Sequence, residues 1–230
     1  MHNEVEKIAD RYERRKAIVG DRYARFNPEV IAGTQERQRA LVSLLKAQGI
    51  SGLAGVDVLE IGCGSGSNLQ ELLLLGAEPE YLVGNELLPE RAAQARRMLP
   101  QAVRIFPGDA SLLPFDEASY DIVYQSTVFS SILDDGLQCR IADAMWRWVR
   151  PGGGILWYDF TFNNPSNPDV RGVPLKRLNA LFPQGRISTR RVTLAPPISR
   201  RVVRLHPKMY GVFNALPLLR THILCFIQKP

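Results

Sequence analysis

Short apolar runs alternate with longer segments of helical character between residues 56 and 160. The runs are five or six residues long and rich in Val, Ile, Leu and Tyr, which is typical of buried strands. Parallel strands need long crossover connections, so this alternation predicts an α/β fold, a Rossmann-like, doubly wound and mostly parallel sheet. The predicted strands are Val56–Ile61, Tyr81–Asn85, Ala102–Phe106, Tyr120–Gln125 and Ile155–Phe160, and the predicted helices are Ser67–Leu75, Pro89–Leu99 and one from Asp134 or Asp135 to Val149.

Helix boundaries in this region have local signals. Ser67-x-x-Gln70 predicts a capping box, and Gly76 a stop for the same helix. The run of proline and glycine at 151–154 is expected to break the last of the three helices.

Before residue 56 the pattern predicts two helices. Residues 3–19 are highly charged with little apolar periodicity, so we expect a helix on the surface, and Glu29 to Gln48 forms a second helix that ends at Gly49. We therefore expect residues 1–50 to be an N-terminal helical extension or lid, and residues 51–230 to be one domain.

After residue 160 repeated prolines interrupt the pattern, so long helices are not expected. A short helix is predicted at Pro174–Leu181. Two strands, Ile187–Leu194 and Thr221–Gln228, are predicted to close the sheet as an antiparallel edge pair. Residues from about 160 to 220 would then form an insert.

Charge is distributed unevenly along the chain. Residues 1–149 hold 16 basic against 21 acidic residues, a net charge of −5, whereas residues 150–230 hold 13 against 2, a net charge of +11. A basic C-terminal third would attract an anionic small molecule, an anionic lipid surface or nucleic acid. A solvated face that balances the acidic half is the alternative explanation.

Three cysteines lie far apart, at 63, 139 and 225. Without C-x-x-C or His/Cys clustering they predict reduced thiols, no metal site and a cytoplasmic location. The N-terminus lacks the apolar core of a signal peptide, and no apolar run approaches the length of about 20 residues that a membrane span needs.

Three alternating glycines, Gly62, Gly64 and Gly66, follow the first predicted strand. Without a Cβ, such a turn lets backbone N–H groups approach a ligand closely. Twenty residues beyond Gly66, the second strand ends at Glu86, where a carboxylate is placed to accept both hydroxyls of a ribose. The pattern predicts an adenosine-type cofactor.

Two departures from the dinucleotide-binding fingerprint argue against a nicotinamide cofactor. Ser67 stands where the dinucleotide fingerprint has its third glycine. Glu60, two residues before the first glycine, would repel a pyrophosphate but suits a cofactor that carries a positive charge.

Five motifs in order over roughly residues 55–160 resemble the class I S-adenosylmethionine-dependent methyltransferases. They are Leu59–Gly66 for the first motif, Val83–Leu87 for the ribose motif, Gly108–Ala110 with Leu113–Asp116 for the adenine turn, Tyr120–Gln125 for the fourth strand, and Val149–Gly153 for the turn before the fifth.

The resemblance implies S-adenosyl-L-methionine as cofactor and a role for each matching residue. Glu86 would accept from the ribose, Asp109 from the adenine amine, and Gln125 from the ammonium of the methionine moiety, with Glu60 near the same end. The implied cofactor-binding residues are Glu60, Gly62, Cys63, Gly64, Glu86, Leu87, Asp109, Ala110 and Gln125.

The resemblance also implies an enzyme that transfers methyl groups. A hydroxyl acceptor benefits from a general base, and Asp159, at the end of the fifth strand, and His206 are the candidates. Capping of a turn is the alternative role for Asp159, and His206 can be an ordinary surface histidine. Tyr23–Arg25 is a candidate lid, and His222 is expected to be structural.

The acceptor is less constrained than the cofactor. Asn163–Arg171 and Leu216–His222 resemble methyltransferases encoded among polysaccharide and lipid-linked glycan genes, which implies a small-molecule or glycan acceptor in the 160–220 insert, with methylation of a hydroxyl oxygen and contact with the inner membrane face. An RNA methyltransferase and a non-catalytic binding protein of the same fold are the alternatives. The amino-methylating tetrad [ND]-P-P-[YFW] is missing after the fourth strand, which disfavours RNA.

Overall fold

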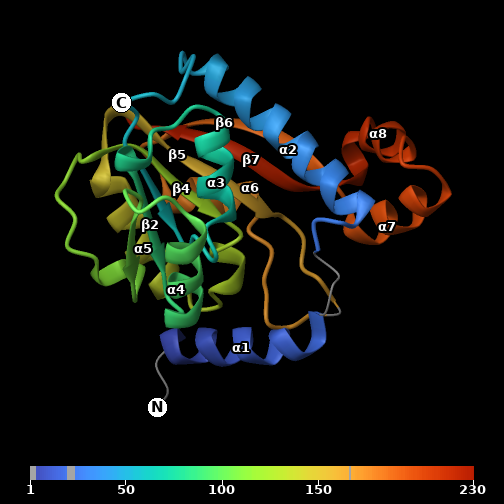
Figure 1. Ribbon diagram of the computed structural model, residues 1–230, viewed down its shortest axis with the longest axis horizontal. Coiled ribbons are helices and arrows are strands. Elements are labelled where there is room, and N and C mark those ends of the chain that lie inside the picture. The colour runs from blue at the N-terminus through green and yellow to red at the C-terminus, as the bar shows by residue number, and fades with distance from the viewer. Residues whose placement is uncertain (1–3, 20–23, 166) are drawn as a thin grey trace.

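The computed structural model describes residues 4–19, 24–165 and 167–230, and it confirms the predicted α/β fold (Figure 1). One sheet of seven strands has the order β3-β2-β1-β4-β5-β7-β6. The strands β1 to β5 are parallel, and β7 runs antiparallel to both β5 and β6, as the edge-pair prediction required. The strands are β1 (Val58–Ile61), β2 (Leu82–Glu86), β3 (Arg104–Pro107), β4 (Tyr120–Ser126), β5 (Val149–Phe160), β6 (Arg186–Leu194) and β7 (Arg220–Gln228).

Helices cover both faces of the sheet. Side chains of α2, α3 and α4 form a core with one face of the strands, and those of α5 and α6 form a core with the other. The side chains of Trp157 and Tyr158 on β5 belong to these two different cores, as the two-residue period of a strand requires. The helices are α1 (Glu4–Val19), α2 (Pro28–Ala47), α3 (Ser67–Leu74), α4 (Pro89–Met98), α5 (Asp135–Trp148), α6 (Leu175–Leu181), α7 (Pro196–Leu205) and α8 (Met209–Asn214).

The parallel register brings the loops after β1 to β4 to one edge of the sheet. Ile61, the last residue of β1, is paired with Asn85 on one side and Gln125 on the other. Backbone hydrogen bonds then join the loops: Cys63 N–H donates to the Asn85 carbonyl at 2.8 Å, and Gly108 N–H donates to the Glu86 carbonyl at 2.9 Å. Ligands of doubly wound sheets bind at this carboxyl edge.

Helix α1 lies at the surface, as its charged sequence predicted, but one of its faces is buried. It runs along the lower side of the molecule in Figure 1, and the side chains of Ile8 and Arg11 are each only 7% exposed. Arg11 donates to the Ser131 carbonyl at 3.1 Å and pairs with Glu4 at 2.6 Å. The buried face of α1 thus contains the charged side chain of Arg11 as well as apolar residues. A pattern of apolar residues alone does not predict such a face.

Two boundaries also differ from the prediction. Gly66, not Ser67, is the N-cap of α3, and no side chain caps that helix, so the predicted capping box is wrong. The strand β5 begins at Val149 and contains the proline and glycine run instead of following it.

Helices α7 and α8 were not expected. Two prolines begin α7, at the first turn, where the missing N–H and fixed φ angle of proline are tolerated. Prolines in the C-terminal third therefore start a helix as well as interrupt the chain.

A substitution of Gly84 on β2 tests how tightly the side chains pack around this strand. A Cβ at this position would lie 2.8 Å from both Sγ of Cys63 and Cδ1 of Ile105. We expect Gly84→Ala to lower the free energy of unfolding by about 1–3 kcal/mol, because the neighbours must move to admit a methyl group. Urea denaturation measures this change.

Gly52→Ala is the matched control, since nothing lies within 4 Å of a Cβ there. Its change should stay within about 0.5 kcal/mol. Equal stability of the two variants would contradict the packing described for β2.

Candidate functional site

The turn between β1 and α3 holds three glycines in the left-handed backbone region. The φ angles of Gly62, Gly64 and Gly66 are 65°, 60° and 87°. A Cβ added to Gly62 would lie 2.5 Å from Cγ2 of Val128, and one added to Gly64 would lie 2.4 Å from Nη2 of Arg91. The backbone conformation therefore favours glycine at both positions, and at Gly62 the packed Val128 side chain leaves no space for a Cβ.

The Glu86 carboxylate joins the end of β2 to this turn. One of its oxygens accepts a hydrogen bond from the Gly64 N–H at 2.8 Å, and the other accepts one from the Leu88 N–H at 2.9 Å. Each carboxylate oxygen has a second lone pair. Glu86 can therefore accept a ligand hydroxyl and hold the turn at the same time.

The loop after β3 brings Asp109 to the same edge. Oδ1 of Asp109 accepts from the backbone N–H and the hydroxyl of Ser111, both at 2.8 Å. Asn85 on β2 fixes this loop by donating to the Gly108 carbonyl at 3.0 Å. No hydrogen bond from a described residue reaches Oδ2 of Asp109, so this oxygen can accept from a ligand amine.

A cavity of about 110 Å³, here called the edge cavity, lies where these loops meet. Helix α1 contributes Tyr12 to its wall, and the Arg91 guanidinium lies 5.1 Å from the centre of the Tyr12 ring. Neither residue belongs to a sequence motif, so neither was expected at this site. The predicted cofactor residues that line the edge cavity are Gly62, Glu86, Leu87, Asp109 and Ala110.

Glu60 is buried beside the edge cavity with half of its carboxylate unpartnered. Oε1 accepts from the Asn68 side chain at 2.6 Å, but Oε2 has no hydrogen-bond partner among the described residues. Burial raises the pKa of Glu60 to about 7, although the Asn68 hydrogen bond and the charge of Arg37 oppose the shift. Arg37 in turn donates to Asn68 and to Glu71, in each case at 3.1 Å.

Two further predicted cofactor residues lie behind the lining. Cys63 is buried, and desolvation holds the pKa of its thiol well above the usual range. The Gln125 amide donates to the Tyr158 carbonyl at 3.3 Å and accepts from the Val128 N–H at 3.0 Å, so it supports the backbone of the next loop. Contact of these two side chains with a cofactor stays a prediction.

The candidate bases lie outside the edge cavity. Asp159 is fully buried and accepts from the N–H groups of Ser130 and Phe160 at 3.1 and 3.0 Å, and burial raises its pKa to about 7. His206 is exposed at the end of α7, where its Nδ1 accepts from the Lys208 N–H at 3.2 Å. Their catalytic roles stay predictions. Tyr23 of the predicted Tyr23–Arg25 lid lies outside the described residues.

Within residues 4–19, 24–165 and 167–230, no cluster of His, Cys, Asp and Glu has the geometry to hold a metal ion. None of the helices described is long and apolar enough to cross a membrane.

Residues 58–153 match the family model of the methyltransferase domain. They form a class I S-adenosylmethionine-dependent methyltransferase domain. S-adenosyl-L-methionine is the cofactor of this domain. A methyltransferase structure from Archaeoglobus fulgidus shares the fold at a TM-score of 0.65 and 14% identity, over 93% of this chain and 99% of its own.

Curated relatives of the methyltransferase domain differ in what they act on. The Drosophila melanogaster tRNA N(3)-methylcytidine methyltransferase Mettl2 is 33% identical over 45% of this chain and 34% of its own length. A phthiotriol/phenolphthiotriol dimycocerosates methyltransferase of Mycobacterium ulcerans is 32% identical over 55% of this chain and 47% of its own. The chain thus spans a third to a half of these relatives, and the resemblance to glycan-cluster methyltransferases stays a prediction.

The residues present fit the cofactor. A positively charged ligand next to Glu60 would compensate the unpartnered Oε2, the glycine turn offers open backbone, and Glu86 and Asp109 keep free acceptor capacity.

The raised pKa of Glu60 makes stability depend on pH. The protonated form is favoured in the folded state, so this stabilisation is fully present below pH 4.5 and is lost as pH rises through 7. Glu60→Gln cannot ionise, so it should not lose this contribution. We expect the free energy of unfolding of Glu60→Gln, minus that of the native protein, to increase by about 2–3 kcal/mol when the pH is raised from 5 to 8. Urea denaturation without ligand at both pH values checks this.

Glu80→Gln removes an exposed carboxylate and serves as control. If the difference in free energy of unfolding between Glu60→Gln and the native protein does not change with pH, the pKa of Glu60 is not raised in the folded state.

Proposed function

We propose that this chain transfers the methyl group of S-adenosyl-L-methionine to a hydroxyl oxygen of a small-molecule or glycan acceptor. The observation that carries the proposal is the edge cavity, which is lined by Gly62 of the glycine turn and by the carboxylates of Glu86 and Asp109, with the unpartnered carboxylate oxygen of Glu60 buried beside it. Acidic side chains at strand ends suit a cofactor whose reactive sulfur is positively charged. When bound, the cofactor supplies an activated methyl group.

Each residue has a role that follows from its position. Glu86, held by two backbone N–H groups, accepts from the ribose hydroxyls. Oδ2 of Asp109 accepts from the adenine amine, and the Ala110 N–H meets a ring nitrogen. Glu60 balances the positive charge at the methionine end and is ionised more readily once that charge is present.

Helix α1 acts as the lid of this site. Ile8 and Tyr12 of α1 form part of the wall of the edge cavity. A shift of α1 away from this wall would widen the cavity for entry of the cofactor. Closure of α1 afterwards would exclude water from the transfer.

The positive charge of the C-terminal third supports the proposed acceptor. The segment from 170 to 230 contains no Asp or Glu, so it presents a positive field to an anionic acceptor such as a lipid-linked glycan. We infer a cytoplasmic protein that acts next to the inner membrane face.

RNA is the second candidate acceptor, and the Drosophila tRNA methyltransferase favours it. Gln125-Ser126-Thr127-Val128 at the end of β4 lacks the amino-methylating tetrad, which argues against it. Transfer of tritiated methyl groups to bulk tRNA, measured beside transfer to a glycan fraction, distinguishes the two acceptors.

Glu86→Gln tests the cofactor assignment. Glutamine keeps one acceptor oxygen and places an NH₂ group against one of the two backbone donors, so we expect the affinity for S-adenosylhomocysteine to fall at least about tenfold. Isothermal titration calorimetry measures the change.

Glu80→Gln, the same substitution on the surface, should bind like the native protein. No heat with the native protein would refute the proposed function itself, and unchanged affinity of Glu86→Gln would refute the role of Glu86.

Tyr12→Leu tests the lid. Leucine keeps apolar bulk but removes the contact of the ring with Arg91, which is worth about 0.5–1 kcal/mol at an exposed site. We expect S-adenosylhomocysteine to dissociate about two- to fivefold faster, measured by stopped-flow fluorescence. Tyr81→Leu, away from α1, is the control, and equal rates for the two variants would exclude a lid role for Tyr12.

A further inference from the structure

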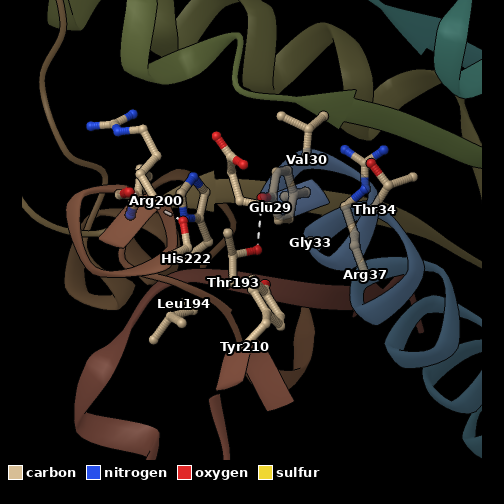
Figure 2. A pocket seen from close by; sticks show the side chains of 13 residues that line it. Glu29, Val30, Gly33, Thr34, Arg37, Thr193, Leu194, Arg200, Tyr210 and His222 are labelled. Atoms are coloured by element: carbon tan, nitrogen blue, oxygen red, sulfur yellow. Dashed lines mark hydrogen bonds between the residues drawn. The ribbon is translucent and has the colours of Figure 1, made fainter. Parts of the chain in front are cut away.

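A second cavity, of about 210 Å³, lies between α2 and the insert that α7 and α8 form (Figure 2). We call it the insert cavity. None of its lining residues lines the edge cavity. Figure 2 shows Gly33 and Arg37 on the α2 side, Tyr210 and Thr193 across from them, and His222 and Arg200 at the other end.

The insert cavity opens at the carboxyl edge of the sheet. Tyr158 is near the end of β5, Thr193 near the end of β6 and His222 near the start of the antiparallel β7, and all three line it. These ends share the edge that carries the cofactor residues.

One hydrogen bond joins the linings of the two cavities. The Thr127 N–H, in the lining of the edge cavity, donates to the carbonyl of Tyr158, in the lining of the insert cavity, at 2.8 Å. In addition, Arg37 of the insert cavity donates a hydrogen bond to Asn68, and Asn68 donates one to Glu60, which lies beside the edge cavity.

The buried polar groups of the insert cavity are not all satisfied by the protein. Tyr210 is 5% exposed and lines the cavity, and its hydroxyl has no hydrogen-bond partner among the described residues. Burial raises the pKa of Tyr210, and the nearby backbone of Leu194 opposes that shift. A buried hydroxyl without a partner costs free energy unless a ligand or water completes it.

Other groups of the lining also suit hydroxyls. The Tyr158 and Thr193 hydroxyls are 2.9 Å apart. Burial, aided by the charge of Arg37, lowers the pKa of His222 to about 4, so its ring is neutral at pH 7 and can accept a hydrogen bond. The neutral ring stacks on Tyr158 at 5.0 Å.

Arg200 gives the insert cavity a cation without a structural partner. Glu29, the acidic residue of the lining, lies in the first turn of α2, where a negative charge is stabilised by the helix dipole. Arg200 lies in the middle of α7, away from the C-terminal turn that favours a cation, and makes no hydrogen bond or ion pair with a described residue. A guanidinium is well suited to bind a phosphate or carboxylate.

We propose that the insert cavity binds the methyl acceptor, and that this acceptor is a hydroxylated compound with an anionic group. The hydroxyls meet Tyr210, Thr193 and His222, and the anionic group meets Arg200. The inference rests on the proposed function, because the cavity has this role only if methyl transfer occurs at the adjoining edge.

Gly33→Leu fills the insert cavity without touching the cofactor site. A Cβ on Gly33 would lie 3.4 Å from the Tyr210 hydroxyl, so the leucine side chain occupies the cavity, and leucine is favoured over glycine inside a helix. Gly211→Leu on α8 is the matched control, since nothing lies within 4 Å of a Cβ there.

Saturation-transfer NMR with S-adenosylhomocysteine present gives the first test. The probes are glucose 1-phosphate, glucuronate and glucose. We expect the native protein and Gly211→Leu to bind both anionic sugars more tightly than glucose, and Gly33→Leu to lose the anionic sugars while its affinity for S-adenosylhomocysteine is unchanged.

Two further variants dissect the contacts. Arg200→Gln should weaken the anionic sugars about tenfold and leave glucose unchanged. Tyr210→Phe removes a hydroxyl that has no hydrogen-bond partner among the described residues, so the variant should fold and bind all three sugars more weakly.

The outcomes separate the two proposals. If the native protein does not bind S-adenosylhomocysteine, the proposed function fails. If it does, but Gly33→Leu binds the sugars like the native protein, or the anionic sugars bind no better than glucose, this inference alone is overturned. A preference for glucose 1-phosphate over glucuronate identifies the anionic group as a phosphate, and the reverse preference identifies it as a carboxylate.

Discussion

The hydrogen bond from the Gly64 N–H to the Glu86 carboxylate holds the cofactor edge together. It links the turn after β1 to the end of β2, two segments that the parallel register has already brought side by side. The second Glu86 oxygen, on the Leu88 N–H, fixes the start of α4, which carries Arg91 toward α1. The glycine turn, the start of α4 and the contact of Arg91 with Tyr12 therefore depend on one buried carboxylate.

Much of this edge could be predicted because its determinants are local. Glycines at positive φ, carboxylates at the ends of apolar runs and crossover helices of ordinary length each leave a signal within a few residues. The burial of α1 and the contact of Tyr12 with Arg91 leave no such signal, because they join segments nearly 80 residues apart in the sequence. Helices α7 and α8 were missed for another reason: proline was read only as a helix breaker.

The two cavities divide the edge between the strands. The edge cavity belongs to the loops after β1 to β4, and the insert cavity to the ends of β5, β6 and β7. Arg37 stands between them, with its charge paired to Glu71, its bond to Asn68 and its guanidinium over the Tyr158 ring at 5.1 Å. These interactions fix the Arg37 side chain, which forms part of the wall of the insert cavity.

The strand β6 forms one of the two edges of the sheet, and the side chains along it affect self-association. Open edge strands are templates for pairing with another chain. Arg186, Arg190 and Arg191 are exposed along β6, and a second copy laid against it would bring like charges together. Arg190 also reaches the Ser43 carbonyl of α2 at 3.3 Å. The basic character of the C-terminal third thereby disfavours pairing of a second copy with the β6 edge of the sheet.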